Sequence, residues 1–484
     1  GKRAHCNGEL ISETILSGDT ISRKWVLNEE IPTYLACIAI SDYQTVHQTF
    51  NGLNGPIPVE LVSSASDTTN MKNSFANLNG AFDAYELGYG PYLWNKVGFS
   101  IVPFSGGAME HATNIAYPQY AVNGNLGNET LMAHEFAHHW WGDLVTCETA
   151  EDMWINEGMA VYSEHLFLEK VYDYQTSMEV VKDNNKAVIQ FTHISEGGFR
   201  AISGVPHEYT YGEHTYQKGA LVAHNMRAYL GDSLFFVGLK SITDNYKFKN
   251  INAAQFRDKL TTSTGIDMTN FFNDWVFSPG FSHFAVDSIE VNSNGPNFDI
   301  EIHIQQKLRG ATIFHLGVPL EITFYDNNWN SYKTNIIASG QYSSYNVTIP
   351  FNPSTYILNE DNKLNQARTD EQIIVKSPGN YATLNDLGLV KTFTVNSLTD
   401  SAMLQFEHHW VAPDPIKNNI NNYRISENRY WSISGFLPTD FSATMKLEFD
   451  GRFSNGFLDL DLVPINGDSL ILLYRESPKS DWEE

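Results

Sequence analysis

Two histidines four residues apart, with a glutamate at a fixed distance after them, constrain this chain more than any other feature. His134 and His138 belong to the run His-Glu-Phe-Ala-His, and Glu157 follows after eighteen intervening residues. On an α-helix, positions i and i+4 lie on the same face, so both imidazoles can bind one ion. Two imidazoles and one carboxylate leave a fourth tetrahedral position open, which is typical of catalytic zinc. The pattern therefore predicts a ligand-bearing helix and a metal-dependent hydrolase.

Glu135 follows the first histidine and is predicted to act as general base toward a water on the metal. The alternative is a buried helix whose histidines satisfy hydrogen bonds in the core, because short motifs also match by chance. His139 lies five positions after His134 and cannot share the i, i+4 face. Glu157 lies in a segment, residues 152–170, whose apolar residues predict a second helix. Its fixed distance from the histidines makes it the third predicted ligand.

Three further segments stand in a fixed order around the histidines. Residues 106–111 read Gly-Gly-Ala-Met-Glu-His, residues 215–220 read Thr-Tyr-Gln-Lys-Gly-Ala, and residues 271–281 contain Phe-Phe-Asn-Asp-Trp and Pro-Gly-Phe. Together with the histidine motif, they resemble the gluzincin zinc metallo-aminopeptidases of the membrane alanyl aminopeptidase type. The resemblance covers roughly residues 30 to 285. It implies an α+β multidomain protein with a thermolysin-like, mostly helical catalytic domain flanked by β-domains, and one Zn²⁺ ion as cofactor.

The resemblance also implies roles for individual residues. Tyr216 stands two places before the Lys-Gly pair and matches the family's catalytic tyrosine, which would stabilise the oxyanion. Tyr209 and Tyr211 are its nearest competitors in sequence. Residues 107–110 match the family's GAMEN substrate-binding motif, and the glutamate there would bind the free α-amine by charge-assisted hydrogen bonds. These substrate-binding residues are Gly107, Ala108, Met109 and Glu110. His111 stands where the family usually has asparagine, which changes the local hydrogen bonding.

The predicted function is therefore a zinc-dependent aminopeptidase that hydrolyses N-terminal residues from peptides with a free N-terminus. One alternative is an epoxide-hydrolase-like or narrow-specificity branch of the same family. Another is a catalytically weak or silent peptide-binding or adhesion protein on the same scaffold. Retention of Glu135 and Tyr216 beside all three ligands argues against a silent scaffold, which needs neither.

Charge narrows the choice of partners. The 484 residues contain 31 Lys and Arg against 56 Asp and Glu, a formal charge of −25. Such a chain is a poor match for nucleic acid or anionic membranes. The sequence contains no apolar stretch long enough to predict a transmembrane segment. A secreted, periplasmic or cell-surface location is favoured over a cytoplasmic one, and the sequence does not indicate an oligomeric state.

The pattern of strand-like and helical runs along the sequence predicts four domains. Residues 1–62 contain strand-like runs such as 34–40 and resemble only the end of the family's N-terminal β-domain, whose main body has no match. Residues 63–283 are predicted to form the mostly helical catalytic domain. Period-two runs at 298–304 and 320–324 predict a β-sandwich over residues 284–375. Runs at 445–449 and 458–462 predict a second β-rich domain over residues 376–484.

The adjacent pair His408 and His409 is a second candidate for metal binding. Neighbouring side chains on a strand point to opposite faces, so the pair is a poor chelate and is interpreted as packing or surface histidines. The aromatic residues Trp410, Tyr430 and Trp431 could line a carbohydrate face, but strands also use such residues for packing.

Overall fold

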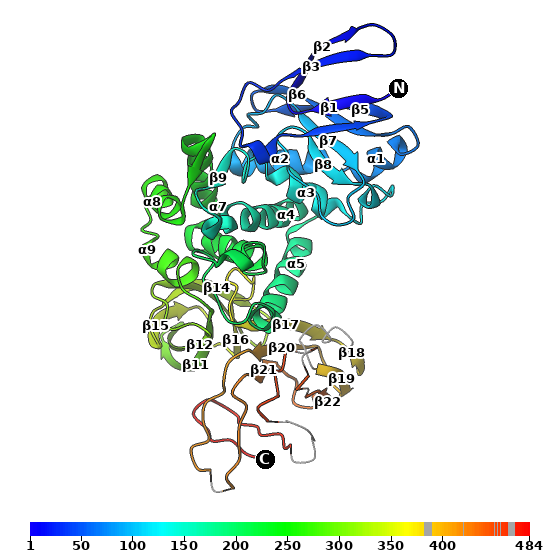
Figure 1. The fold of residues 1–484 in the computed structure, drawn as a ribbon. Coiled ribbons are helices and arrows are strands. Elements are labelled where there is room, and N and C mark those ends of the chain that lie inside the picture. The colour runs from blue at the N-terminus through cyan, green and yellow to red at the C-terminus, as the bar shows by residue number, and fades with distance from the viewer. Residues whose placement is uncertain (382–389, 420, 450, 453, 455, 463–469) are drawn as a thin grey trace. The chain divides into compact units, whose positions relative to one another are not determined.

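In a computed structural model of the chain, all residues are described except 382–389, 420, 450, 453, 455 and 463–469 (Figure 1). The chain forms two compact units. Unit 1 comprises Gly1–Val181 and Ile202–Met268, and unit 2 comprises Lys182–Ala201 and Thr269–Glu484. Sheets and helices both contribute, so the multidomain α+β class is confirmed. The finer division into four domains stays a prediction.

A four-stranded mixed sheet lies at the start of unit 1 (Figure 1). Its strands are β5 (Tyr43–Gly52), β6 (Gly55–Ser64), β7 (Val97–Val102) and β8 (Ile115–Pro118). β5 and β6 are antiparallel, whereas β6, β7 and β8 run parallel. The sheet thus continues through the expected boundary at residue 62. The sequence predicts a mostly helical domain over residues 63–283, and β7 was not among the expected strands. Its short apolar run cannot be distinguished from a buried helix by periodicity alone.

The remaining N-terminal strands form two antiparallel pairs. β1 (Arg3–Cys6) pairs with β4 (Ile38–Ser41), and β2 (Glu9–Ile15) pairs with β3 (Ile21–Val26). The run at 34–40 is only partly a strand, because its first residues form the 3₁₀ turn η1 (Thr33–Leu35). The Leu35 N–H donates to the Pro32 carbonyl at 3.1 Å and closes this turn.

Helices form most of the rest of unit 1. Their bounds are α1 (Thr68–Ser74), α2 (Leu78–Tyr89), α3 (Glu129–Ala137), α4 (Glu157–Val171), α7 (Gln217–Tyr246) and α8 (Ala253–Thr264), with short 3₁₀ turns at η2 (Gln119–Ala121), η3 (Ala150–Ile155) and η5 (His207–Tyr209), and with the small parallel pair β9 (Val145–Cys147) and β10 (Lys249–Ile251). α5 (Tyr174–Ala187) begins in unit 1 and ends in unit 2. The Asn252 side chain accepts the Gln255 N–H at 2.9 Å and caps the N-terminus of α8.

Aromatic rings join the sheet and helices of unit 1. Phe82 of α2 packs against Phe50 of β5, with ring centroids 5.2 Å apart. On its other side, Phe82 stacks on Phe136 of α3 at 6.2 Å. Trp140 is fully buried against Phe136. The helix that carries the histidine motif is therefore fixed by a dense aromatic core.

The expected helix over residues 152–170 is divided in two. The turn η3 ends at Ile155, and α4 begins at Glu157. Asn156 lies at the break, where its side chain accepts the Cys147 N–H at 2.9 Å and donates to Thr146 Oγ1 at 3.0 Å. These bonds fix the point at which α4 begins, and with it the position of Glu157.

Unit 2 is mostly antiparallel sheet. The first two sheets contain β11 (Phe281–Asn294), β12 (Asn297–Arg309) and β15 (Tyr342–Ile349), then β14 (Ser331–Ala338), β13 (Val318–Tyr325) and β16 (Thr355–Leu358). The next two contain β17 (Arg368–Val375), β20 (Ala402–His409) and β21 (Tyr430–Phe436), then β18 (Gly379–Tyr381), β19 (Val390–Ser397) and β22 (Ser442–Leu447). Short helical turns are η4 (Val188–Thr192), α6 (His193–Ser195), α9 (Thr269–Phe271) and η6 (Phe272–Val276).

The strand expected at residues 458–462 is wrong. The alternating Leu and Asp residues there form a turn. Asp459 is buried and pairs with Arg429 through two hydrogen bonds of 2.9 and 2.6 Å. Alternation alone predicted a half-exposed strand, but the buried ion pair requires a carboxylate on the inside.

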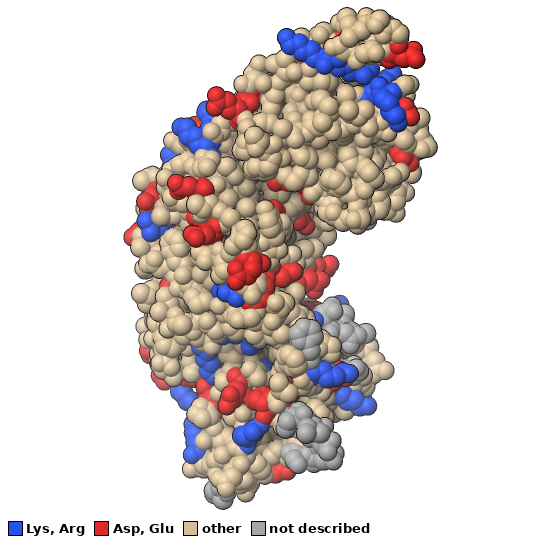
Figure 2. All heavy atoms as spheres, in the orientation of Figure 1, with Lys and Arg blue, Asp and Glu red and all other residues tan. Residues whose placement is uncertain are grey.

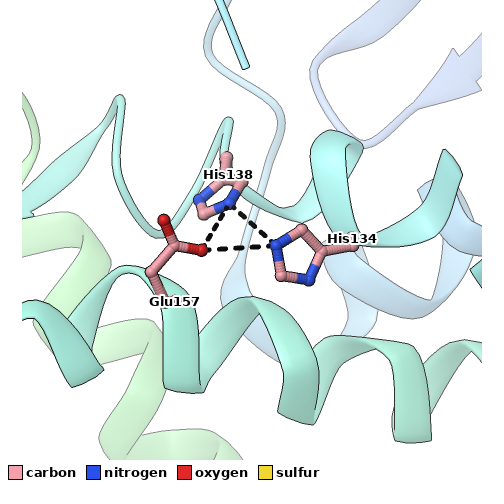
Figure 3. Close-up of side chains that lie close together, drawn as sticks. All are labelled: His134, His138 and Glu157. Atoms are coloured by element: carbon pink, nitrogen blue, oxygen red, sulfur yellow. Dashed lines mark hydrogen bonds and ion pairs between the residues drawn. The ribbon is translucent and has the colours of Figure 1, made fainter. Parts of the chain in front are cut away.

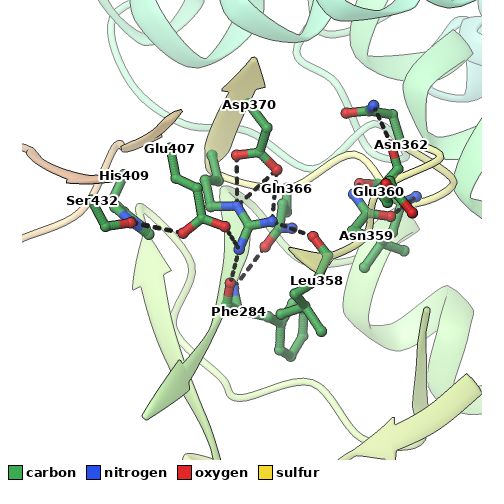
Figure 4. Close-up of polar contacts among 12 residues, drawn as sticks. Phe284, Leu358, Asn359, Glu360, Asn362, Gln366, Asp370, Glu407, His409 and Ser432 are labelled. Atoms are coloured by element: carbon green, nitrogen blue, oxygen red, sulfur yellow. Dashed lines mark hydrogen bonds and ion pairs between the residues drawn. The ribbon is translucent and has the colours of Figure 1, made fainter. Parts of the chain in front are cut away.

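A buried polar network lies among β11, β17, β20 and β21 (Figure 4). Arg368 pairs with Asp370 at 2.6 Å and lies 3.4 Å from Glu407. His409 contacts Ser432 Oγ at 2.7 Å, and that hydroxyl donates to Glu407 at 2.8 Å. His408 lies on the strand beside His409 and packs its ring on Trp410 at 4.2 Å. Both histidines are buried, and the structure supports the interpretation that they pack within the fold.

Acidic side chains gather at several separate places on the face shown in Figure 2, with basic ones between them. Among the described residues, no helix has both the length and the apolar composition of a membrane span.

Candidate metal centre and active site

The three predicted ligands converge in unit 1 (Figure 3). His134 Nε2 and His138 Nε2 are 3.2 Å apart, and each lies 3.3 Å from Glu157 Oε2. All three residues are buried. The histidines come from the end of α3, where His138 is the C-cap, and the glutamate from the first turn of α4. A carboxylate at a helix N-terminus is favoured by the helix dipole.

The donor set fits a zinc ion. Tetrahedral ligands about 2.0–2.1 Å from zinc lie roughly 3.3 Å from one another, which is the spacing of these three atoms. Burial by itself lowers the pKa of His138, but the nearby Glu157 carboxylate outweighs this effect and raises that pKa to about 9. The same attraction holds the pKa of Glu157 well below its usual range, against the effect of burial. The site therefore stabilises positive charge.

A second layer of hydrogen bonds orients the two imidazoles. His134 Nδ1 lies 2.9 Å from Glu164 Oε1, and His138 Nδ1 donates to the Trp141 carbonyl at 2.8 Å. Each bond leaves Nε2 as the ligating nitrogen. The sequence analysis did not select Glu164. The available signal was its position seven residues after Glu157, which places both glutamates on the same face of α4.

Glu135 is buried beside the ligands. Burial raises the pKa of its carboxyl group to about 7, and the nearby carboxylates of Glu110 and Glu157 act in the same direction. The charges of His134 and His138 oppose this rise. A carboxyl group that titrates near neutral pH can both take up and release a proton.

Tyr216 lies against the first ligand. Its ring stacks on the His134 imidazole, with the ring centroids 6.1 Å apart and the planes at 6°. Burial and the charge of Glu157 raise its pKa well above the usual range, so the hydroxyl keeps its proton. Of the two competing tyrosines, Tyr211 is 71% exposed and Tyr209 lies in the turn η5.

Two glycines let α7 approach α4 closely enough for this contact. A Cβ placed on Gly219 would lie 2.9 Å from the Gly158 Cα, and a Cβ on Gly158 would lie 2.9 Å from the Thr215 carbonyl oxygen. Gly158 follows Glu157 directly, and Gly219 comes one turn after Tyr216. The glycine of the Lys-Gly pair is therefore required by helix packing at the metal centre.

Glu110 lies close to the general-base candidate, Glu135. One atom each of Glu110, Glu135 and His138 lies within 4.8 Å of the other two. Met109 forms a two-bond antiparallel bridge with Ala116 of β8, with N···O distances of 3.0 and 2.9 Å. This bridge continues the edge of the sheet beside the metal centre. Gly107 and Ala108 precede it, and Gly107 is exposed with φ at +65°.

His111, which replaces the family's usual asparagine, is partly buried next to Glu110. Its Nδ1 atom is buried and has no hydrogen-bond partner among the residues that the structure describes. Burial lowers the pKa of this imidazole, although Glu110 opposes the shift. The structure therefore places Glu110, Glu135, Tyr216 and the three ligands around one centre.

The two histidines and the glutamate form a donor set suited to zinc. Residues 72–275 match the Peptidase family M1 domain. Over this domain the chain is similar to the gluzincin aminopeptidases.

Curated relatives are aminopeptidases. A leucyl aminopeptidase of Saccharolobus solfataricus is 23% identical over 346 residues, which are 65% of this chain and 43% of the relative. An aminopeptidase N of Lactobacillus delbrueckii subsp. lactis is 28% identical over 221 residues, 42% of this chain and 26% of the relative. The chain thus spans less than half of the length of these relatives.

Solved structures share the fold. Aminopeptidase A of Legionella pneumophila, in complex with aspartic acid, superposes with a TM-score of 0.60 at 17% identity, covering 75% of this chain and 42% of that one. An M1 zinc metallopeptidase from Deinococcus radiodurans gives a TM-score of 0.51 at 20% identity, covering 57% of this chain and 61% of that one.

Proposed function

We propose that this chain is a zinc-dependent aminopeptidase that removes N-terminal residues from peptides. The observation that carries the proposal is the position of Glu110, whose carboxylate lies close to Glu135 and His138 beside the ligand set. An endopeptidase has no need of an anion at this place. An aminopeptidase needs one, because its substrate carries an ammonium group next to the bond that is cut.

The substrate would pair with the sheet edge as an added strand. Its ammonium group would donate to Glu110, and its first carbonyl would then face the ligand set. The short distance between the Glu110 and Glu135 carboxylates would limit cleavage to the first peptide bond. A substrate with more residues before the cleaved bond would collide with Glu110.

Glu135 would transfer the protons. Bound zinc lowers the pKa of a water molecule to about 7, which makes a nucleophile available at neutral pH. Glu135 would take the proton from the attacking water and pass it to the leaving amine. The buried position of its carboxyl group keeps this transfer away from bulk solvent.

Tyr216 would donate its hydroxyl hydrogen to the oxygen that becomes negative in the transition state. Preorganised donors of this kind stabilise developing charge without a reorganisation cost. The raised pKa of Tyr216 suits this role, because the hydroxyl remains a donor across the working pH range.

The test is hydrolysis of a panel of aminoacyl-4-nitroanilides by zinc-loaded protein, with and without a chelator. Each substrate is paired with its N-acetylated form, which removes the ammonium group. We expect cleavage only of the free-amine substrates, and loss of cleavage with chelator. Glu135→Gln should reduce kcat by about 10²- to 10⁴-fold with zinc still bound. Glu110→Gln should act mainly by raising KM.

The other hypotheses give different results. A silent binding protein would bind peptides without turnover, and Glu135→Gln would change nothing. An epoxide-hydrolase-like enzyme would convert an epoxide substrate and leave every nitroanilide intact. Equal cleavage of free and acetylated substrates would contradict amine recognition by Glu110.

A further inference from the structure

His139 follows the second zinc ligand and takes no part in metal binding, yet it is almost completely buried, with 1% of its surface exposed. Its ring makes contacts on two sides. Nδ1 lies 2.9 Å from the Tyr92 hydroxyl, and Nε2 accepts the Thr113 backbone N–H at 3.3 Å. His139 therefore connects the zinc-binding motif to the turn that follows Glu110.

The partners of His139 select one tautomer. The Tyr92 hydroxyl donates to the Lys96 carbonyl at 2.7 Å, so it can only accept from the imidazole. Nδ1 must then carry the hydrogen, which leaves Nε2 as the acceptor for Thr113. Tyr92 is itself 2% exposed, so solvent cannot replace this partner. Hydrogen-bond donation therefore runs in one direction, from the Thr113 N–H through His139 and the Tyr92 hydroxyl to the Lys96 carbonyl.

Thr113 needs such support because its backbone is strained. Its φ is +61°, a region that threonine avoids and that costs on the order of 1–3 kcal/mol. The residue is fully buried, and a Cβ on Gly98 would lie 2.2 Å from its carbonyl oxygen. Its hydroxyl accepts the Gly8 N–H at 2.7 Å. Strained conformations persist only where the surroundings fix them, and they cluster at functional sites.

The strained residue closes the turn directly after Glu110. The Asn114 N–H donates to the His111 carbonyl at 3.0 Å, and the neighbouring Ala112 carbonyl accepts from the Asn7 side chain at 2.5 Å. On the other side of Glu110, Met109 is bonded to Ala116. Glu110 therefore sits in a loop that is fixed at both ends, and His139 holds the end next to the zinc helix.

We propose that His139 is a positioning residue of the substrate site, which holds the turn of residues 111–114 and thereby sets the Glu110 carboxylate against the metal centre. The inference rests on the proposed aminopeptidase function for its catalytic consequence. The positional part concerns the backbone alone and can be measured without substrate.

Two substitutions separate the two sides of the ring. The asparagine amide lies about as far from the backbone as Nδ1 of histidine. His139→Asn therefore keeps the contact with Tyr92 and loses the acceptor for the Thr113 N–H. Gln reaches the depth of Nε2, so His139→Gln keeps an acceptor for Thr113. The matched control is Tyr89→Phe, which removes an equally buried hydroxyl bonded instead to Ser163 at 2.7 Å.

The first measurement is hydrogen–deuterium exchange of the amides in residues 109–116 of the zinc-loaded protein. Loss of one hydrogen bond should speed exchange in this segment by about tenfold in His139→Asn. His139→Gln should restore most of the protection, and Tyr89→Phe should not change this segment. Equal exchange in the Asn and Gln variants would overturn the inference, whatever the activity.

The second measurement is the division between kcat and KM on an aminoacyl-4-nitroanilide, with zinc content checked in each variant. His139→Asn should raise KM by about tenfold, with a much smaller change in kcat and full zinc occupancy. A fall in kcat with unchanged KM would also overturn the inference. If wild-type protein cleaves no substrate while the exchange pattern holds, the proposed function fails and the positioning role stands.

If both His139 variants fail to fold, Tyr92→Phe tests the same chain. It removes the group that fixes the tautomer and leaves the imidazole in place, so exchange in residues 109–116 should again rise relative to Tyr89→Phe. Equal protection in the two tyrosine variants would count against the inference.

Discussion

Glu164 is bonded to the first zinc ligand, His134, and so affects the metal without touching it. We expect Glu164→Leu to weaken zinc binding by about 10- to 100-fold, because the imidazole loses the carboxylate that orients it. Glu164→Gln should be milder, since its amide oxygen still accepts a hydrogen bond. Zinc affinity can be measured by competition with a chromophoric chelator. Glu169→Gln on the same helix, where Glu169 pairs with Arg227, is the control. Equal zinc affinity in Glu164→Leu and wild type would contradict this role.

Tyr216 can be tested by removing only its hydroxyl. Tyr216→Phe should lower kcat by about 10²- to 10³-fold, because a donor aimed at the developing oxyanion is lost. KM and zinc content should change little. Tyr211→Phe is the matched control, because Tyr211 was a competitor in sequence and is largely exposed. If the control loses as much activity as Tyr216→Phe, the assignment is wrong.

At the residue level, sequence spacing predicted the ligands because they lie on two neighbouring helices. The i, i+4 rule places His134 and His138, and Glu157 follows at a short chain distance. The roles of Glu110 and Tyr216 came only from resemblance, since no local pattern distinguishes them from other acids and tyrosines. His139 could not be assigned from sequence, because no local pattern links it to Thr113 and the strained backbone of Thr113 has no sequence signal.

Among the structural elements, the contact of α4 with α7 is the most sensitive to side-chain size. Gly219→Ala would place its Cβ 2.9 Å from the Gly158 backbone, which cannot yield without moving a helix. We expect a loss of about 1–3 kcal/mol in stability and weaker zinc binding, because Glu157 shifts with α4. Thermal denaturation and zinc competition measure the two effects.

Gly88→Ala is the control for that substitution. Gly88 lies within α2, and its added Cβ would meet the Phe236 ring at 3.4 Å, an ordinary contact. Alanine is favoured over glycine inside a helix by about 0.5–1 kcal/mol, so this variant should be neutral or more stable. A Gly219→Ala protein as stable as Gly88→Ala would contradict the packing argument.

Helices and strands were predicted best where a regular pattern of apolar residues extends over many positions. The strands β12 and β13 agree with the predicted runs because alternation is a local signal. β7 was missed, because a buried parallel strand shows an apolar run without alternation. The turn at 458–462 was predicted as a strand, because the ion pair of Asp459 with Arg429 depends on a distant partner.

For the molecule as a whole, buried neutral histidines make the folded state less stable as the pH falls. Burial, together with the smaller effect of nearby His224, lowers the pKa of His165 to about 3. A histidine in an unfolded chain titrates near 6.5. The folded state therefore binds fewer protons in acid, and this contribution to stability, present above pH 6.5, is lost as the pH falls toward 3. Between pH 7 and 5, this one residue costs about 2 kcal/mol.

The corresponding measurement is thermal denaturation of wild type and His165→Gln at several pH values between 7 and 5. We expect a smaller fall in melting temperature in the variant, since glutamine does not titrate. His47→Gln replaces an exposed histidine and should keep the wild-type pH slope. Identical slopes in all three proteins would show that His165 does not contribute.

The bond between Asn7 and Ala112 joins residues 105 positions apart, and the bond between Gly8 and Thr113 spans the same separation. The zinc ligands and their supports, by contrast, lie within residues 134–164. Closing long loops is slower than forming local contacts. The metal centre and the loop that carries Glu110, the proposed site for the substrate ammonium group, should therefore form at different times during folding. In a refolding experiment, zinc uptake should precede the return of peptidase activity, and their simultaneous recovery would contradict this order. Newly made protein would then pass through a stage in which it holds its metal and cannot yet bind the end of a peptide.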